Sequence, residues 1–210
     1  MDEQEKTLYK RAYAFALFIV IYNVIEGLVS MVLGYKDESL TLFGFGVDSF
    51  IEVASNLGVI YMIKRIQQNL HSSRTPFETT ALKITGYGFY LLSVGLAIGI
   101  VENILQKGRP QDTFWGIVIA LLSIGVMYYV AHSQIKTGKA LNSSPIIADA
   151  KCTMVCIYMS IILLASSFIY ELTGFGYIDS IGAAGLIYFS VSEGREALEK
   201  AKGKECGDCC

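Results

Sequence analysis

The chain has 210 residues, of which 53% are hydrophobic, and a formal net charge of -2 at pH 7. Its mean hydropathy of +0.47 exceeds that of an ordinary soluble domain. The near-neutral charge excludes nucleic acid from the expected partners. The five cysteines are an odd number without a secreted-type framework, which favours metal or redox chemistry over structural disulfides.

Apolar segments follow one another along the chain, at residues 12–33, 40–63, 84–105, 114–131, 146–169 and 177–192. A helix needs about 20 apolar residues to cross a bilayer, so the last segment is short for a span. The connection before the third segment contains Pro76 and polar residues, and we expect it to be a loop. The sequence therefore predicts an all-α membrane protein with six transmembrane helices over residues 12–192. An N-terminal segment (1–11) and a tail (193–210) flank this domain.

Lysine and arginine are distributed unevenly between the connections. Cytoplasmic termini leave only Lys36, Lys107 and Arg109 outside. The basic residues on the cytoplasmic side are then Lys6, Lys10, Arg11, Lys64, Arg65, Arg74, Lys83, Lys136, Lys139, Lys151, Arg195, Lys200, Lys202 and Lys204. The positive-inside rule therefore predicts that both termini lie in the cytoplasm.

Two pairs of functional side chains lie within apolar segments. Asp48 and Glu52 occur in the second segment, and Cys152 and Cys156 in the fifth. Each pair is spaced i, i+4, so both side chains fall on one helix face. Two carboxylates and two thiols form a suitable four-ligand site for a divalent metal. Two alternatives stay open: the cysteines are small buried residues, or the carboxylates form a structural pair satisfied by Asn56 or by hydroxyl groups.

The depths of these residues in the membrane agree with a shared site. At about 1.5 Å of rise per residue, Asp48 lies about 12 Å and Glu52 about 18 Å below the outer end of the second segment. Cys152 and Cys156 lie about 9 Å and about 15 Å above the inner end of the fifth segment. In a hydrocarbon core about 30 Å thick, Glu52 is then level with Cys152, and Asp48 with Cys156.

Other polar residues admit two interpretations each. Asp149 shares the helical stripe of the two cysteines and either lines an ion path or caps the start of its helix. Asn23 and Glu26 in the first segment either line the ion path or join helices by hydrogen bonds. In the tail, three cysteines either capture a thiophilic ion or form an incidental flexible end: Cys206, Cys209 and Cys210. Small residues at 182–185 permit close packing inside the bundle or in a homodimer.

Two motifs resemble those of the cation diffusion facilitator family. "SLTLFGFGVDSFIE" is similar to the family's helix 2 motif, with Asp48 and Glu52 at the ligand positions. "SSPIIADAKCTMVC" is similar to the helix 5 motif, with Cys152 and Cys156 in place of the usual His and Asp. "GFGVDSFIE" and "EGREAL" resemble a short bacterial branch. The resemblance implies a homodimeric metal transporter of the bacterial inner membrane, and we expect this chain to lack the family's cytosolic metal-binding domain.

Ligand chemistry and this resemblance together predict the function. Mixed oxygen and sulfur ligands suit Zn²⁺ first and Cd²⁺ closely behind, whereas Mg²⁺ and Ca²⁺ prefer oxygen ligands alone. Thiols lose protons when they bind metal, so we expect export from the cytosol by proton antiport. No permanent cofactor and no enzymatic activity are implied. The alternatives are a membrane thiol-disulfide oxidoreductase using Cys152 and Cys156, and a metal-sensing or structural membrane protein.

Overall fold

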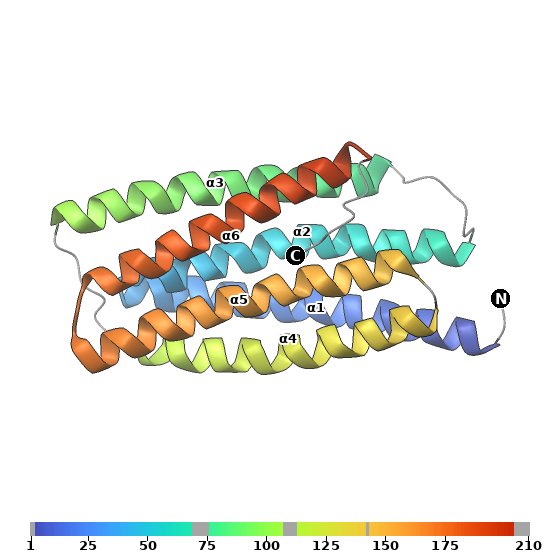
Figure 1. Cartoon of the computed structure of the whole chain (residues 1–210), viewed down its shortest axis with the longest axis horizontal. Coiled ribbons are helices and arrows are strands. Elements are labelled where there is room, and N and C mark those ends of the chain that lie inside the picture. The colour runs from blue at the N-terminus through green and yellow to red at the C-terminus, as the bar shows by residue number, and fades with distance from the viewer. Residues whose placement is uncertain (1–2, 69–75, 107–112, 142, 204–210) are drawn as a thin grey trace.

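The computed structural model describes residues 3–68, 76–106, 113–141 and 143–203, apart from the side chains of residues 4, 106, 144, 145, 148, 149, 151 and 152. This part of the chain forms six α-helices and contains no strand. In chain order they are α1 (Glu3–Lys36), α2 (Leu40–Gln68), α3 (Pro76–Gln106), α4 (Phe114–Ala140), α5 (Ser144–Thr173) and α6 (Tyr177–Ala201) (Figure 1). The all-α prediction is confirmed.

The helices extend beyond the apolar segments that predict them. The predicted loop before the third segment ends earlier than expected: the sequence places Pro76 in the loop, whereas α3 begins at this proline. A proline fits the first helical position, where its missing N–H would have no helical partner. Helix α6 continues to Ala201, into the segment assigned to the tail. The ion pairs Arg195–Glu199 and Glu196–Lys200, each spaced i, i+4, support this last part of α6.

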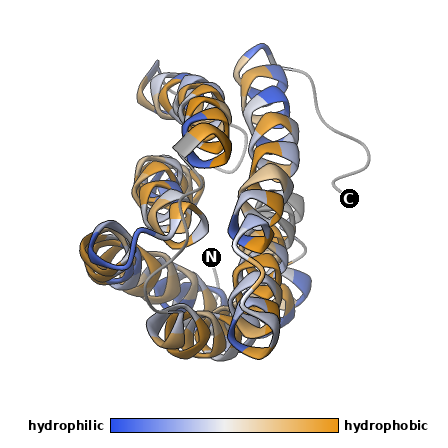
Figure 2. Ribbon diagram, turned by 90° about the vertical axis from the view of Figure 1, so that its left-hand side faces the viewer, coloured by the Kyte–Doolittle hydropathy of each residue, from blue (hydrophilic) through white to orange (hydrophobic). Residues whose placement is uncertain are grey.

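Successive helices run in opposite directions, so the start of α1 and the end of α6 lie at the same end of the bundle (Figure 1). The most extensive contacts join α1 with α2, α4 with α5, and α3 with α6. Helix α2 also packs against α3, α5 and α6. Hydrophobic residues recur on every helix when the bundle is viewed along its length (Figure 2). Helix α2, which carries the predicted carboxylates, is therefore surrounded by other helices.

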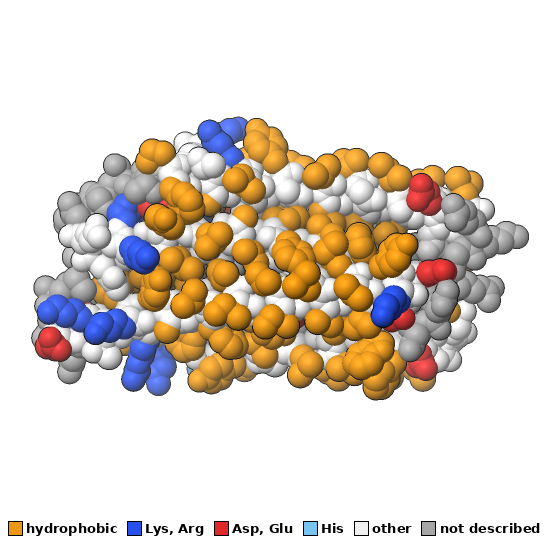
Figure 3. Space-filling view, turned by 180° about the vertical axis from the view of Figure 1, so that it is seen from behind, with side chains coloured by type: hydrophobic (Ala, Val, Ile, Leu, Met, Phe, Trp, Pro, Cys, Tyr) orange, Lys and Arg blue, Asp and Glu red, His pale blue; other side chains and the backbone are white. Residues whose placement is uncertain are grey.

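One face of the bundle shows a broad apolar belt with charged residues toward both ends (Figure 3). Large hydrophobic side chains are exposed on the described helices, among them Leu91 (74%) and Tyr188 (72%). Five of the described helical segments are long and apolar enough to cross a membrane: those of α1 to α4, and Thr153–Thr173 of α5. Apolar surface on this scale faces lipid rather than water. The protein is an integral membrane protein.

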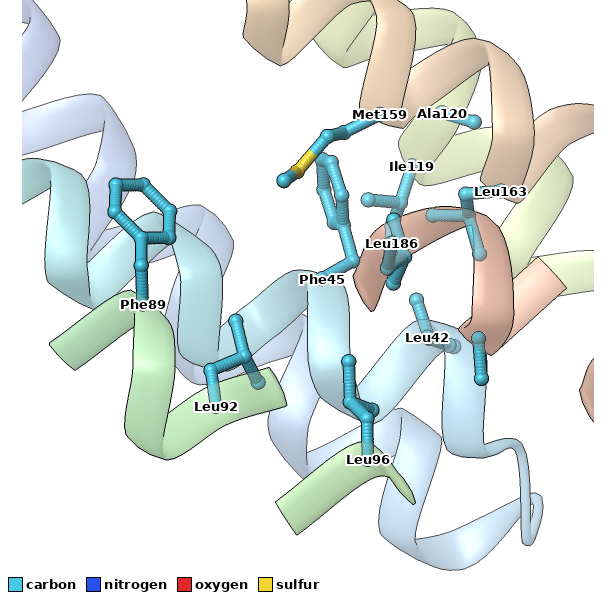
Figure 4. Packing of buried hydrophobic residues seen from close by; sticks show 11 residues of the cluster. Leu42, Phe45, Phe89, Leu92, Leu96, Ile119, Ala120, Met159, Leu163 and Leu186 are labelled. Carbon is cyan, nitrogen blue, oxygen red and sulfur yellow. The ribbon is translucent and has the colours of Figure 1, made fainter. Parts of the chain in front are cut away.

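Hydrophobic packing fills the half of the bundle near the start of α2. Leu42 and Phe45 of α2 meet Leu96 of α3, Leu163 of α5 and Leu186 of α6 (Figure 4). Leu163 and Leu186 are completely buried. We call this set the apolar plug. It lies between the predicted carboxylates of α2 and the end of the bundle where α2 begins.

The small residues of α6 pack inside the protomer. A Cβ atom added to Gly182 would lie 2.7 Å from the Cβ of Ser166 on α5 and 2.8 Å from Oγ1 of Thr41 on α2. One added to Gly185 would lie 3.1 Å from Cδ1 of Ile162 on α5. These positions therefore serve close helix contact within one chain, which is the first of the two uses considered from the sequence.

Side-chain interactions tie α2 to its neighbours at both ends. At its start, the buried Asp179 of α6 accepts hydrogen bonds from the backbone N–H groups of Leu40 (2.7 Å) and Thr41 (3.2 Å) and from the hydroxyl of Ser39 (2.9 Å). The Ser39 hydroxyl also accepts a hydrogen bond from the N–H of Leu42 (3.2 Å). The first N–H groups of α2, which have no partner within the helix, are thus satisfied by α6 and by Ser39.

At the other end of α2, Arg65 forms a two-pronged ion pair with Glu78 of α3. Its Nε donates to Glu78 Oε1 at 2.7 Å, and its Nη2 donates to Oε2 at 3.1 Å. Only 4% of the Glu78 side chain is exposed. A buried pair with this geometry is stronger and more directional than an exposed one. It fixes the end of α2 against the start of α3.

Asp179→Ala is expected to destabilise the folded protein by about 2 kcal/mol, because it leaves N–H groups of α2 without an acceptor. Asp179→Asn keeps one acceptor oxygen and should lose less. Thermal unfolding of the purified protein in detergent, followed by the fluorescence of the single Trp115, measures both effects. Equal unfolding temperatures for the wild type and Asp179→Ala would contradict a capping role.

Candidate metal centre

The helices enclose a cavity of about 70 Å³, and all six contribute to its lining. Asp48 and Glu52 reach it from α2, Cys156 from α5 and Glu193 from α6. The i, i+4 spacing on α2 accounts for both carboxylates facing the same space. The structure thus brings three of the four predicted metal ligands to one cavity.

The Glu52 carboxylate accepts hydrogen bonds from two neighbouring helices. The thiol of Cys156 on α5 donates a hydrogen bond to its Oε1. The amide of Asn23 on α1 donates to its Oε2 at 2.9 Å. The Asn56 amide donates to the backbone carbonyl of Glu52, also at 2.9 Å. The contacts from α5 and α1 orient the Glu52 carboxylate, and the first of them sets a thiol directly against it.

The residues of α2 and α5 that meet differ from those expected from their depth in the membrane. The depth estimate paired Asp48 with Cys156, whereas Cys156 contacts Glu52, one helical turn further along α2. Rise per residue gives depth along a straight helix but does not give the tilt or the true ends of two packed helices. Since α5 begins at Ser144 and α2 extends to Gln68, the two helices meet at a different level.

Asp48 is 2% exposed, and its Oδ1 has no hydrogen-bond partner in the described part of the chain. A buried carboxylate oxygen without a partner is costly, and most such atoms in folded proteins are paired. The carboxyl groups of Glu52, Glu193 and Glu26 lie near it. This environment suits a cation.

Several predicted site residues cannot be compared with the structure. The side chains of Asp149 and Cys152 on α5 lie outside the described residues, as does the tail with Cys206, Cys209 and Cys210. Among the described His, Cys, Asp and Glu side chains, no three are arranged as a metal-binding group. The four-ligand site that includes Cys152 stays a prediction.

Glu26 belongs to a second buried polar cluster. It accepts hydrogen bonds from the hydroxyls of Tyr22 (2.9 Å) and Ser49 (3.2 Å), and it is 7% exposed. Asn23, on the same helix, contacts Glu52 instead. The helix-joining interpretation of both residues therefore agrees with their hydrogen bonds, while a role in an ion path stays a prediction.

Sequence reasoning missed the acidic residues of α6. Glu193 and Glu196 line the cavity together with Lys200. Glu193 directly follows the apolar segment 177–192 and looked like the first residue of an aqueous tail. Its spacing from Glu196 and Lys200 (i, i+3 and i, i+7) places all three on one helix face, and this pattern was the available signal.

Carboxylates around a cavity inside a membrane-spanning bundle are typical of proteins that move ions across the membrane. The family model described as the cation efflux transmembrane domain matches residues 16–202. The chain therefore belongs to this family, the cation diffusion facilitators, as its two motifs predict. It is similar to an uncharacterized transporter of Methanocaldococcus jannaschii, with 25% identity over 154 residues. The match covers 71% of this chain and 52% of the relative, so the chain spans about half the length of this curated relative.

Asn23→Ala is expected to weaken binding of a divalent cation in this cavity by about 10- to 100-fold, because it releases one oxygen of Glu52 from its fixed orientation. Calorimetric titration of the purified protein with zinc measures the change. Ser30→Ala is a matched control: Ser30 is also buried on α1, but it is not among the residues that line the cavity. Equal zinc affinity in both variants would show that Asn23 does not position a ligand.

Proposed function

We propose that the protein exports a divalent transition-metal cation from the cytosol, zinc first and cadmium closely behind, in exchange for protons. The observation that carries this proposal is the convergence of Asp48, Glu52 and Cys156 on one cavity inside a membrane bundle. Carboxylate and thiolate ligands suit these metals, and Mg²⁺ and Ca²⁺ prefer oxygen alone. Membership of the cation efflux family supports transport of a cation.

The distribution of basic residues between the two ends of the bundle supports one orientation in the membrane. In the described part of the chain, the end at which α2 begins has a single basic residue, Lys36. The opposite end gathers the others, as the blue groups of Figure 3 show: Lys6, Lys10, Arg11, Lys64, Arg65, Lys83, Lys136, Lys139, Arg195, Lys200 and Lys202. The positive-inside rule supports cytoplasmic termini. Helix α6 has 25 residues, or about 37 Å, which supports a sixth span.

The cavity and the apolar plug lie on opposite sides of Asp48. The cavity lining continues along α6 to Lys200, near the basic end of the bundle. On the other side, Leu42 and Phe45 pack against Leu186 and close the bundle. This arrangement supports a conformation in which the site is reached from the cytosol and separated from the outside.

The contact between Cys156 and Glu52 supports proton exchange. The thiol donates its hydrogen to the carboxylate that would share the metal with it. Metal can replace this proton only when the thiol ionises, so metal loading releases a proton and protonation favours metal release. No histidine lines the cavity within the described residues, so carboxylates and thiols must exchange the protons themselves.

The competing function has less support. The thiol of Cys156, whose side chain is described, donates a hydrogen bond to Glu52. A thiol oxidoreductase would give no role to Asp48 and Glu52 in the same cavity. We also propose a homodimer. This proposal rests on the family resemblance alone, since the small residues of α6 pack inside the protomer and give it no support.

Asp48→Asn and Glu52→Gln are each expected to abolish zinc flux, because both changes keep the side-chain size and remove a ligand charge. Flux is measured with a fluorescent zinc indicator inside sealed proteoliposomes that carry a pH gradient. Glu102→Gln, an exposed position on α3, is the control and should transport like the wild type. Normal zinc flux in either variant would show that the carboxylate replaced in it is not a metal ligand.

Changing Cys152 to His together with Cys156 to Asp replaces both sulfurs by nitrogen and oxygen. The ratio of cadmium to zinc transport should fall, because thiolate is the softer ligand and favours cadmium. Transport of each metal alone and in competition, in the same proteoliposomes, gives the ratio. A ratio that stays constant or rises would indicate that neither cysteine coordinates the transported ion.

A further inference from the structure

Helix α6 brings additional charges to the cavity, on its cytosolic side in the proposed orientation. Glu193, Glu196 and Lys200 line it along successive turns. Lys200 Nζ and Glu196 Oε1 are 2.6 Å apart, and 21% of each side chain is exposed. The ion pair is therefore half-buried at the part of the cavity nearest the end of α6.

Packing against α3 determines which face of α6 points inward. A Cβ atom added to Gly194 would lie 3.0 Å from the carbonyl oxygen of Gly86 and 3.1 Å from the Cβ of Phe89. The two helices thus approach closely beside Glu193, and this side chain is held at the cavity. It lines the same cavity as Asp48, Glu52 and Cys156.

The charges of the cavity are not balanced. Asp48, Glu52 and Glu193 share it with Glu196, and Lys200 is the one cation among its described lining residues. Like charges in a partly buried space repel one another strongly, and a divalent cation relieves this repulsion. The buried Oδ1 of Asp48, which has no hydrogen-bond partner in the described chain, independently indicates that the cavity is built to receive a cation.

We propose that Glu193 and Glu196 form a second cation site at the cytosolic mouth of the cavity, with Lys200 as a tethered cation that an arriving divalent metal displaces. The proposal rests on the proposed export function. Both ligands are carboxylates, so this outer site binds hard and borderline divalent ions, including Mn²⁺, with little discrimination. Selection by softness then occurs deeper in the cavity, where the Cys156 thiol takes part.

The outer site is tested in a protein whose deep site has been removed by Asp48→Asn, Glu52→Gln and Cys156→Ser. Mn²⁺ binding to this purified variant is measured by electron paramagnetic resonance of the free ion. One weak Mn²⁺ site should remain, and adding Glu193→Gln should abolish it. Glu199→Gln is the matched control, because Glu199 lies on the same helix, pairs with Arg195 and is not among the residues that line the cavity.

Lys200→Gln should change Mn²⁺ affinity in the direction opposite to Glu193→Gln. Removing the competing cation should tighten Mn²⁺ binding several-fold in the same background, a gain that a misfolded variant cannot produce. Absence of the Mn²⁺ site, a site that persists in Glu193→Gln, or unchanged binding in Lys200→Gln would each overturn the proposal.

Zinc flux separates this inference from the function on which it rests. In proteoliposomes with otherwise native sequence, Glu193→Gln should raise the KM for zinc several-fold, while Glu199→Gln leaves it unchanged. If the wild type transports no divalent metal, the export function itself is wrong. If the wild type transports zinc and Glu193→Gln has the same KM, only the outer site is wrong.

Discussion

The structure depends on one constraint: α2 carries two carboxylates through a bundle whose outer surface is apolar. Contacts of α2 with α1, α3, α5 and α6 keep Asp48 and Glu52 away from that surface. Neighbouring helices also supply polar partners, with Asn23 from α1 and Cys156 from α5 both contacting Glu52. Ionisable groups at membrane depth are tolerated only in such an interior. The central position of α2 is thus a requirement of its charges.

The same arrangement divides the interior into two parts with different chemistry. Toward the start of α2, Leu42, Phe45 and Leu186 exclude water and ions. Toward the basic end, α6 adds Glu193 and Lys200 to the cavity. A transporter that changes its access between two sides must reverse this division in part of its cycle. Repacking of the apolar plug, which contains no charged residue, is the step that such a reversal requires.

The sequence was sufficient to predict an all-helical chain and to predict that Asp48 and Glu52 share one helix face, because helical spacing and the cost of charge in lipid are local properties. It could not predict which residues of α2 and α5 meet, since the contact of Cys156 with Glu52 depends on helix tilt and helix ends. It also missed Glu193. A carboxylate just beyond an apolar segment resembles one that leaves the membrane, and only the packing of α6 against α3 shows that it faces the cavity.

The link between Asp179 and the start of α2 also bears on synthesis of the chain. Asp179 lies 139 residues after Leu40, whose N–H it accepts, so a long stretch of chain separates the two partners. At about 5–20 residues per second, α2 emerges roughly 7–28 s before the residue that completes its first turn. During that interval its first N–H groups must bind water or lipid headgroups. The start of α2 therefore acquires its final hydrogen bonds only after α6 has been made.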